Sequence, residues 1–183
     1  MNVPSRVFET ERLVLRRLDE SDADFIFELV NDPDWLRYIG DKGVKTLDDA
    51  RTYIRTGPVA MYERVGFGLY LVQSKESGAP IGICGLIKRD TLKDVDIGFA
   101  FLPAFRAQGY AREAASATLA YARDVLHLPR VIAITSPDNH DSARLLEKIG
   151  LRFETMQRHG SETHDVRVFG IDLGGGTASP APA

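Results

Sequence analysis

The sequence lacks several features that would identify its class of protein directly. It holds one cysteine, Cys84, among 183 residues, so no internal disulfide is possible and nothing points to an oxidising compartment. No apolar run approaches the ~20 residues of a membrane span, and the first residues lack the apolar core of a signal peptide. The four histidines show no spacing typical of metal ligands. These absences predict a cytoplasmic protein with no bound metal and no membrane partner.

The chain also lacks a strong excess of charge of either sign. Its formal net charge is −3 and its isoelectric point is near 5.8, which argues against a nucleic-acid partner held through its phosphates. Hydrophobic residues make up 44% and charged residues 27%, as in a globular protein long enough for one domain with a sizeable core. We expect that domain to span 1–173 and the stretch 174–183 to be a low-complexity, disordered tail.

Hydrophobic periodicity predicts strands and helices along the whole chain. The strands are expected at 11–18, 67–74, 80–89, 94–102, 131–136, 151–158 and 165–173. The helices are expected at 19–31, 46–63, 109–127 and 140–149, with a short helix around Trp35 and a bend at Pro58. Antiparallel strands followed by a β-α-β-α-β stretch predict an α+β fold. Its centre would be a mixed, mostly antiparallel sheet of about seven strands with helices on both faces.

The most informative segment lies between a predicted strand and an Ala-rich predicted helix. It runs from Leu102 to Ala111 and contains Arg106-x-x-Gly109-x-Ala111. A small-residue turn that opens a helix presents unpaired backbone N–H groups at the positive end of the helix dipole, which suits a phosphate or pyrophosphate. Glycine leaves room for a ligand close to the backbone, and Arg106 adds a positive charge. The spacing matches neither the dinucleotide nor the P-loop fingerprint.

A second motif follows later in the chain. Its members span a predicted helix between an N-cap asparagine and a C-terminal glycine: Asn139, Ser142, Leu145, Glu147, Lys148 and Gly150. Taken alone, this pattern indicates only a well-capped helix. Together and at this separation, the two motifs resemble those of the GCN5-related N-acetyltransferases, the GNAT family. The segments Glu11–Arg16 and Asp19–Ala23 resemble the branch that includes ribosomal-protein N-terminal acetyltransferases.

The resemblance implies a GNAT-like fold, acetyl-CoA as co-substrate and no metal. The cofactor-binding residues that it implies are Phe101, Leu102, Arg106, Ala107, Gln108, Gly109, Tyr110, Ala111, Asn139 and Ser142. In the family the loop binds the pyrophosphate, and the strand backbone near Phe101 and Leu102 binds the pantetheine in a cleft where two strands splay apart. The asparagine that matches Asn139 also hydrogen-bonds the pantetheine.

Two residues are candidates for proton transfer. Asp96 stands where this branch usually has a glutamate that acts as general base, and the shorter aspartate favours a water relay. The alternative is a solvated or turn-capping carboxylate, and Asp94 is a lesser competitor. Many family members place a general-acid tyrosine where this chain has Leu146. In the ribosomal-protein branch the serine that matches Ser142 has that role by analogy, but it is also an ordinary helix-start residue, and water could protonate the thiolate.

The resemblance therefore implies an enzyme that transfers the acetyl group of acetyl-CoA directly to a primary amine. The branch favours a protein or peptide N-terminus as acceptor, and a small-molecule amine is the alternative. Aromatic side chains that could line the acceptor wall are Trp35, Tyr38, Tyr53 and Tyr62. A catalytically silent acyl-CoA-binding or sensor domain and a nucleotide-binding module remain open as other functions. The sequence does not choose between a monomer and a homodimer.

Overall fold

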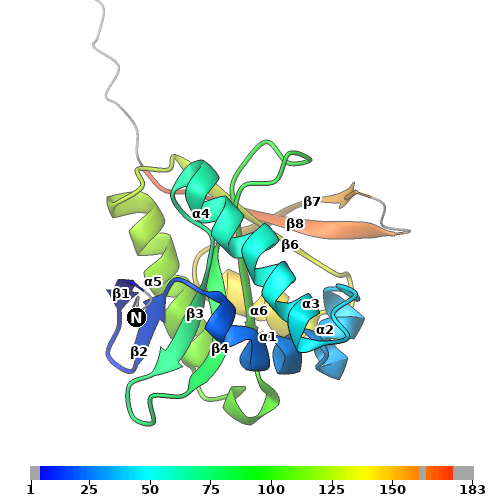
Figure 1. Ribbon diagram of the computed structural model, residues 1–183. Helices are drawn as coiled ribbons and strands as arrows, with labels where there is room; N and C mark the ends of the chain where they lie inside the picture. The colour runs from blue at the N-terminus through cyan, green and yellow to red at the C-terminus, as the bar shows by residue number, and fades with distance from the viewer. Residues whose placement is uncertain (1–4, 161–163, 175–183) are drawn as a thin grey trace, which may run out of the picture.

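Eight strands form one sheet in the computed structural model, which describes residues 5–160 and 164–174 (Figure 1). The strands are β1 (Arg6–Glu9), β2 (Leu13–Arg16), β3 (Leu69–Ser74), β4 (Pro80–Ile87), β5 (Asp96–Phe101), β6 (Arg130–Thr135), β7 (Arg152–Arg158) and β8 (Asp165–Asp172). The α-helices are α1 (Ala23–Val30), α2 (Pro33–Tyr38), α3 (Leu47–Ile54), α4 (Ala60–Val65), α5 (Tyr110–Asp124) and α6 (His140–Lys148). All but the first residue of the expected tail 174–183 lies outside the described residues.

The strand order across the sheet is β1-β2-β3-β4-β5-β6-β8-β7. Every neighbouring pair is antiparallel except β5 and β6, which are parallel. The predicted mixed, mostly antiparallel sheet is therefore confirmed, with eight strands instead of about seven. The additional strand is β1, an edge strand of four residues that pairs with β2 through a register shift between Arg6 and Phe8. It has no fully buried residue, so it lacks the apolar alternation that would have predicted it.

Helices cover both faces of the sheet, as predicted (Figure 1). On one face α5 and α6 pack through small and branched side chains: Ala114, Ala115, Ala122, Ala143 and Leu146. On the other face α1, α2 and α3 pack on Leu71 and Ile83. The buried alanines of α5 let that helix lie close to the strands, so its N-terminus is held firmly at the end of β5. No helix in the described part of the chain is long and apolar enough to cross a membrane.

The expected bend at Pro58 is a π-helical turn, Arg55–Val59, that joins α3 to α4. Proline has no N–H to donate and crowds the preceding turn, so a wider turn accommodates it without ending the helical rod. α3 begins with a capping box in which Thr46 and Asp49 satisfy each other's backbone N–H groups. α4 ends at Gly66, whose φ of 84° suits glycine. The rod lies along the face that carries α1 (Figure 1).

β5 and β6 part almost as soon as they meet. They pair at one position, Asp96 opposite Ile132, and the Ile132 N–H donates to the Val95 carbonyl at 2.9 Å. Because peptide groups turn alternately to the two neighbours of a strand, the odd-numbered residues of β5 turn theirs toward β6. Beyond Asp96 the peptide groups of Phe99 and the N–H of Phe101 therefore face a gap inside the sheet.

An arginine holds the closed end of this gap. Arg130, at the start of β6, pairs with Asp94 at 3.3 Å, with Asp172 at 3.2 Å and with Glu154. These three carboxylates raise the pKa of Arg130, and the largest cause is the hydrogen bond that Arg130 donates to Glu154. Gly170 makes room for the cluster, since a side chain there would collide with Arg130 and Glu154. The strands are therefore joined firmly at the point from which they diverge.

Candidate active site

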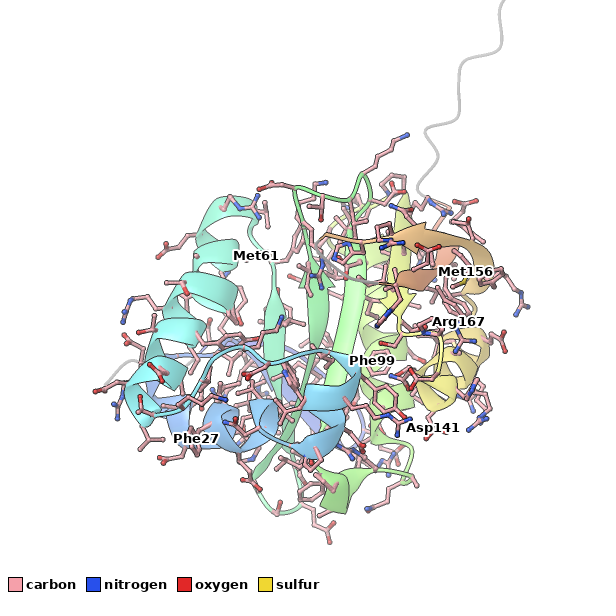
Figure 2. All side chains as sticks on the ribbon, turned by 90° about the vertical axis from the view of Figure 1, so that its right-hand side faces the viewer. Phe27, Met61, Phe99, Asp141, Met156 and Arg167 are labelled. Atoms are coloured by element: carbon pink, nitrogen blue, oxygen red, sulfur yellow. The ribbon has the colours of Figure 1, made fainter. Side chains whose placement is uncertain are left out.

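A cleft of about 1190 Å³ opens where β5 and β6 part. It is lined by α2, by the π-helical turn, by β5 with the loop that follows it, and by the start of α6. Met61, Phe99 and Asp141, which belong to its lining, are labelled in Figure 2. Most of the residues that the two motifs singled out therefore lie around one cavity, although they are far apart in the sequence.

The loop before α5 has the geometry of a backbone anion site. Ala107 and Gly109 have φ angles of 58° and 83°, and left-handed residues that alternate with ordinary ones turn successive N–H groups into one concavity. No side chain caps α5 at Gly109. The first helical bond runs from the Glu113 N–H to the Gly109 carbonyl at 3.0 Å, so the N–H groups of 110–112 have no helical acceptor. Positive φ at an alanine costs energy and is typical of a functional loop.

Arg12, in the turn between β1 and β2, holds this loop from behind. Its guanidinium donates to the Gln108 carbonyl at 3.0 Å and lies 4.3 Å from the centre of the Tyr110 ring. Its Nε pairs with Glu113 at 2.7 Å, and Thr10 Oγ1 donates to the same carboxylate at 2.6 Å. Sequence reasoning missed Arg12, because its partners lie about a hundred positions away and no local pattern connects them.

The sequence predicts Arg106 as a positive charge at the mouth of the loop, but its side chain is bonded to other parts of the chain. Its Nε donates to the Phe101 carbonyl at 3.0 Å. The two terminal nitrogens pair with Asp34 at 2.5 Å and with Asp32 at 2.7 Å. Both carboxylates belong to the start of α2, where Asp32 is the N-cap. The charge of Arg106 is therefore already compensated by α2.

The backbone of Leu102 also differs from expectation. Its N–H donates to the Ile81 carbonyl and its carbonyl accepts from the Phe105 N–H, both at 3.0 Å. The N–H is therefore already bonded within the sheet, while the carbonyl keeps a second lone pair, so a pantetheine contact at Leu102 would have to use that carbonyl. The physical reason is strand phase: even-numbered residues of this segment turn toward β4. Phe101 and Phe99 have the phase that faces the gap.

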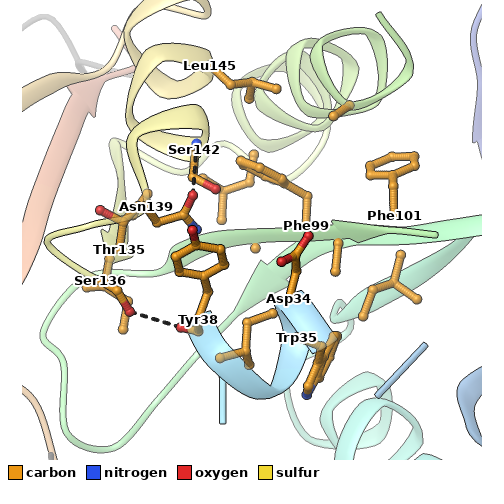
Figure 3. Close-up of a pocket in the computed structure, with 18 of the residues that line it drawn as sticks. Asp34, Trp35, Tyr38, Phe99, Phe101, Thr135, Ser136, Asn139, Ser142 and Leu145 are labelled. Atoms are coloured by element: carbon orange, nitrogen blue, oxygen red, sulfur yellow. Dashed lines mark hydrogen bonds between the residues drawn. The ribbon is translucent and has the colours of Figure 1, made fainter. Parts of the chain in front are cut away.

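Asn139 caps α6 at the edge of the cleft (Figure 3). Its Oδ1 accepts the Ser142 N–H at 3.2 Å, which leaves the amide nitrogen of the same side chain able to donate elsewhere. Asn139 and Ser142 both line the cleft. Leu146, where many family members have tyrosine, is 1% exposed in the core and has no proton to give. Ser142 carries a hydroxyl group that can donate a proton, and it lines the cleft at the start of α6.

Three of the four aromatic residues expected near an acceptor do line the cleft: Trp35, Tyr38 and Tyr53. Tyr38 extends from α2 toward Asn139 and Ser142, and its carbonyl accepts from Ser136 Oγ at 3.0 Å (Figure 3). Tyr62 is a core residue instead. Its hydroxyl donates to the Leu69 carbonyl, and its ring stacks on Tyr70 with centroids 5.5 Å apart.

Asp96 is buried at the point where β5 and β6 part, and it lines the cleft. Its Oδ1 accepts from Arg89 Nε at 3.0 Å. Burial raises the pKa of Asp96, and the charges of Arg89 and His159 partly oppose that rise. A carboxylate with a raised pKa is a stronger proton acceptor than an exposed aspartate. Arg89 was not predicted as a site residue, since in the sequence it appears only as half of a basic pair with Lys88.

We expect Asn139→Ala to raise the KM for acetyl-CoA and to lower stability by about 1 kcal/mol, the usual value of a lost cap. Steady-state kinetics and thermal unfolding measure the two effects. Thr46→Ala is the matched control, because it removes the cap of α3 away from the cofactor loop and should lower stability alone. Equal kinetics in both variants would leave Asn139 with a purely structural role.

Comparisons with known proteins agree with this geometry. Residues 12–152 match the acetyltransferase (GNAT) domain family. YoaA of Bacillus subtilis, described as an uncharacterized N-acetyltransferase, is 29% identical over 171 residues, covering 90% of this chain and 96% of its own. A crystal structure of a GNAT-family acetyltransferase from Bacillus anthracis is 31% identical, with a TM-score of 0.75 over 90% of this chain and 97% of that one.

A third comparison concerns the fold alone. RimL, the ribosomal L7/L12 alpha-N-protein acetyltransferase, was solved in complex with coenzyme A and superposes with a TM-score of 0.78 at 20% identity. It covers 92% of this chain and 98% of its own. The fold and the cleft define an acyltransferase class. The chain belongs to the GNAT family of acetyltransferases, whose members use acetyl-CoA.

Proposed function

We propose that the protein transfers the acetyl group of acetyl-CoA directly to a primary amine. The observation that carries the proposal is the gap between β5 and β6, with the uncapped start of α5 at its mouth and the buried Asp96 where the strands meet. A donor with a pyrophosphate at one end and a thioester at the other suits this arrangement of an anion site and a proton acceptor.

The chain's own groups fit acetyl-CoA at three places. The N–H groups of 107–111 and the first turn of α5 would bind the pyrophosphate. The N–H groups of Phe99 and Phe101 face the gap and would bind the pantetheine amides as a neighbouring strand does. The amide nitrogen of Asn139 would donate from the opposite wall. When bound, acetyl-CoA supplies the activated acetyl group.

Two side chains would transfer protons during the reaction. Asp96 would accept the proton of the acceptor ammonium, directly or through water, because burial makes it more basic than an exposed aspartate. Ser142 lines the cleft at the start of α6 and would return a proton to the thiolate. The catalytically silent alternative binds acetyl-CoA equally well, so turnover discriminates between the two functions.

For the acceptor we propose a compound with one amine, such as a protein or peptide N-terminus. All aspartates that line the cleft are ion-paired in the structure: Asp32, Asp34, Asp96, Asp141 and Asp165. No glutamate is among the lining residues. A polyamine needs several uncompensated carboxylates, which this cleft does not offer in its described part. The charges that line the cleft therefore favour an acceptor with a single ammonium over a polyamine.

The test is an amine-panel assay with acetyl-CoA and thiol release as readout. The panel holds peptides with a free Ser or Ala N-terminus, their N-terminally blocked versions as controls, simple alkylamines, spermidine and an aminoglycoside. We expect turnover with the free peptides and none with the blocked ones. Turnover confined to spermidine or the aminoglycoside would overturn the acceptor class. Tight acetyl-CoA binding without turnover on any amine would instead favour a binding or sensor domain.

We expect Arg89→Gln to shift the acid side of the kcat profile to higher pH. Asp96 works only when ionised, so the rate falls as pH drops through its pKa. Burial raises that pKa and Arg89 lowers it, so loss of the guanidinium raises it further. The measurement uses a strongly basic amine that stays protonated across the pH range, so that the ionisation of the acceptor does not enter the profile. Arg55→Gln, which removes an exposed ion pair with Glu20, is the control and should leave the profile unchanged. An unshifted profile in Arg89→Gln would mean that the acid limb does not report the ionisation of Asp96.

A further inference from the structure

The helix α2 spans the open side of the gap between β5 and β6. At its start, Asp32 and Asp34 pair with Arg106, which follows β5. At its end, the Tyr38 carbonyl accepts from Ser136, in the segment that follows β6 (Figure 3). A six-residue helix is too short to be stable alone, so its position depends on its contacts with the rest of the chain, and these two attachments are among them.

We propose that Arg106 is a positioning residue for the acceptor wall, and that it acts through α2 instead of through the pyrophosphate. This rests on the proposed acetyl transfer. Its Nε is fixed on the Phe101 carbonyl at 3.0 Å, so the fork formed by its two terminal nitrogens points at α2. The fork contacts two carboxylates at 2.5 and 2.7 Å, one of which, Asp32, has a side chain only 9% exposed. An arginine with these three partners has its charge compensated and its orientation fixed.

The same contacts help to determine where three wall residues lie. Asp34 and Trp35 are consecutive in α2, and Tyr38 follows one turn later; all three line the cleft. Trp35 is 5% exposed and packs with the α1 and α3 core, so the first turn cannot shift without opening that core. Arg106 therefore joins the segment that carries the anion loop to the wall that the acceptor would touch. The anion loop itself has a separate support in Arg12.

Two variants that remove opposite ends of the same ion pair test the assignment. Arg106→Gln removes the charge, and Asp34→Asn removes one partner but leaves Arg106 charged. Both should raise the acceptor KM about tenfold and leave the calorimetric Kd for acetyl-CoA within about twofold. This is expected if the acceptor wall loses its position while the groups that bind the pyrophosphate are unchanged. The double variant should show little more than either single one, because the two residues act through one contact. Asp48→Asn, in the first turn of α3, is the control for a helix-start aspartate that pairs with an arginine.

Amide hydrogen exchange of 33–38 gives a readout that does not need turnover. Exchange there should quicken in both single variants and stay unchanged in Asp48→Asn. A tenfold weaker Kd for acetyl-CoA in Arg106→Gln, with normal binding and normal acceptor KM in Asp34→Asn, would overturn the proposal and make Arg106 a pyrophosphate ligand. Unchanged exchange of α2 in both single variants would also overturn it. If the native protein acetylates no amine, the proposed function fails, while calorimetry and exchange still decide the role of Arg106. Arg12→Gln serves as the opposite reference, since it should weaken acetyl-CoA binding without affecting α2.

Discussion

Asp96→Asn is expected to reduce turnover by about 10²- to 10⁴-fold, the usual contribution of a positioned proton acceptor. The amide has nearly the same shape as the carboxylate and can still accept from Arg89 at the same site, so the fold should persist. Acetyl-CoA affinity should barely change, because Asp96 lies where the strands meet, far along β5 from the anion loop. Single-turnover kinetics and calorimetry give the two quantities. The variant should also lose the acid limb of the rate profile.

Asp94→Asn is the matched control for this variant. Asp94 lies two residues earlier and pairs with Arg130 at 3.3 Å, so its loss should lower stability and leave kcat unchanged. Near-normal turnover in Asp96→Asn, with a pH profile that follows the acceptor's own pKa, would mean that water alone removes the proton. A raised acceptor KM with normal saturated turnover would make Asp96 a recognition group. Either result removes Asp96 from the catalytic residues.

Gly109→Glu is expected to abolish measurable acetyl-CoA binding. The residue has a φ of 83°, which disfavours any side chain, and a Cβ there would lie 3.2 Å from Arg12 Nη2, on the side where Arg12 supports the loop. A glutamate there would compete for Arg12, which supports the loop, and would add a negative charge beside the N–H groups, so the pyrophosphate would be repelled and would lose several charge-assisted hydrogen bonds. Calorimetry with CoA measures the loss. Unchanged affinity would rule out the pyrophosphate assignment of this loop.

Gly109→Ala separates charge from backbone strain in this experiment. Alanine has the same unfavourable positive φ, and its Cβ would lie 3.2 Å from Arg12 Nη2. Both variants should therefore lose a similar amount of thermal stability, while the alanine variant keeps measurable binding. Equal loss of binding in the two would assign the effect to backbone conformation instead of electrostatic repulsion.

The elements that the sequence predicts best are those with a strong internal period or clear ends. β4 is buried on both faces along most of its length, α5 is long and buried on one side, and both lie within their predicted ranges. The strand expected at 11–18 shortens to Leu13–Arg16 because only there does it pair with β3. β1 was not predicted, since it has too few residues to show alternation, and at Pro58 the sequence predicted the bend but not its π-helical form.

In the site, too, the sequence predicts the features that depend on neighbouring residues and misses those that depend on residues far along the chain. The positions of Gly109 and Asn139 follow from helix-end rules, so the sequence could indicate them. The two carboxylates that pair with Arg106 lie more than seventy residues away, and only the packing of α2 brings them together. The direction of the Leu102 N–H, toward β4 or toward the gap, depends on strand phase, and a shift of one residue reverses that phase.

The seam between β5 and β6 also bears on the lifetime of the protein. One paired position in the middle of the sheet divides the hydrogen-bond ladder into a five-strand and a three-strand part, so the unliganded chain is weakest where its substrate would bind. A ligand that fills the seam adds roughly 2.7 kcal/mol at a hundredfold excess over its Kd. That would lower the unfolded fraction available to proteases by about a hundredfold. On the proposed function, the abundance of this protein would therefore follow the acetyl-CoA supply of the cell, with no dedicated regulator.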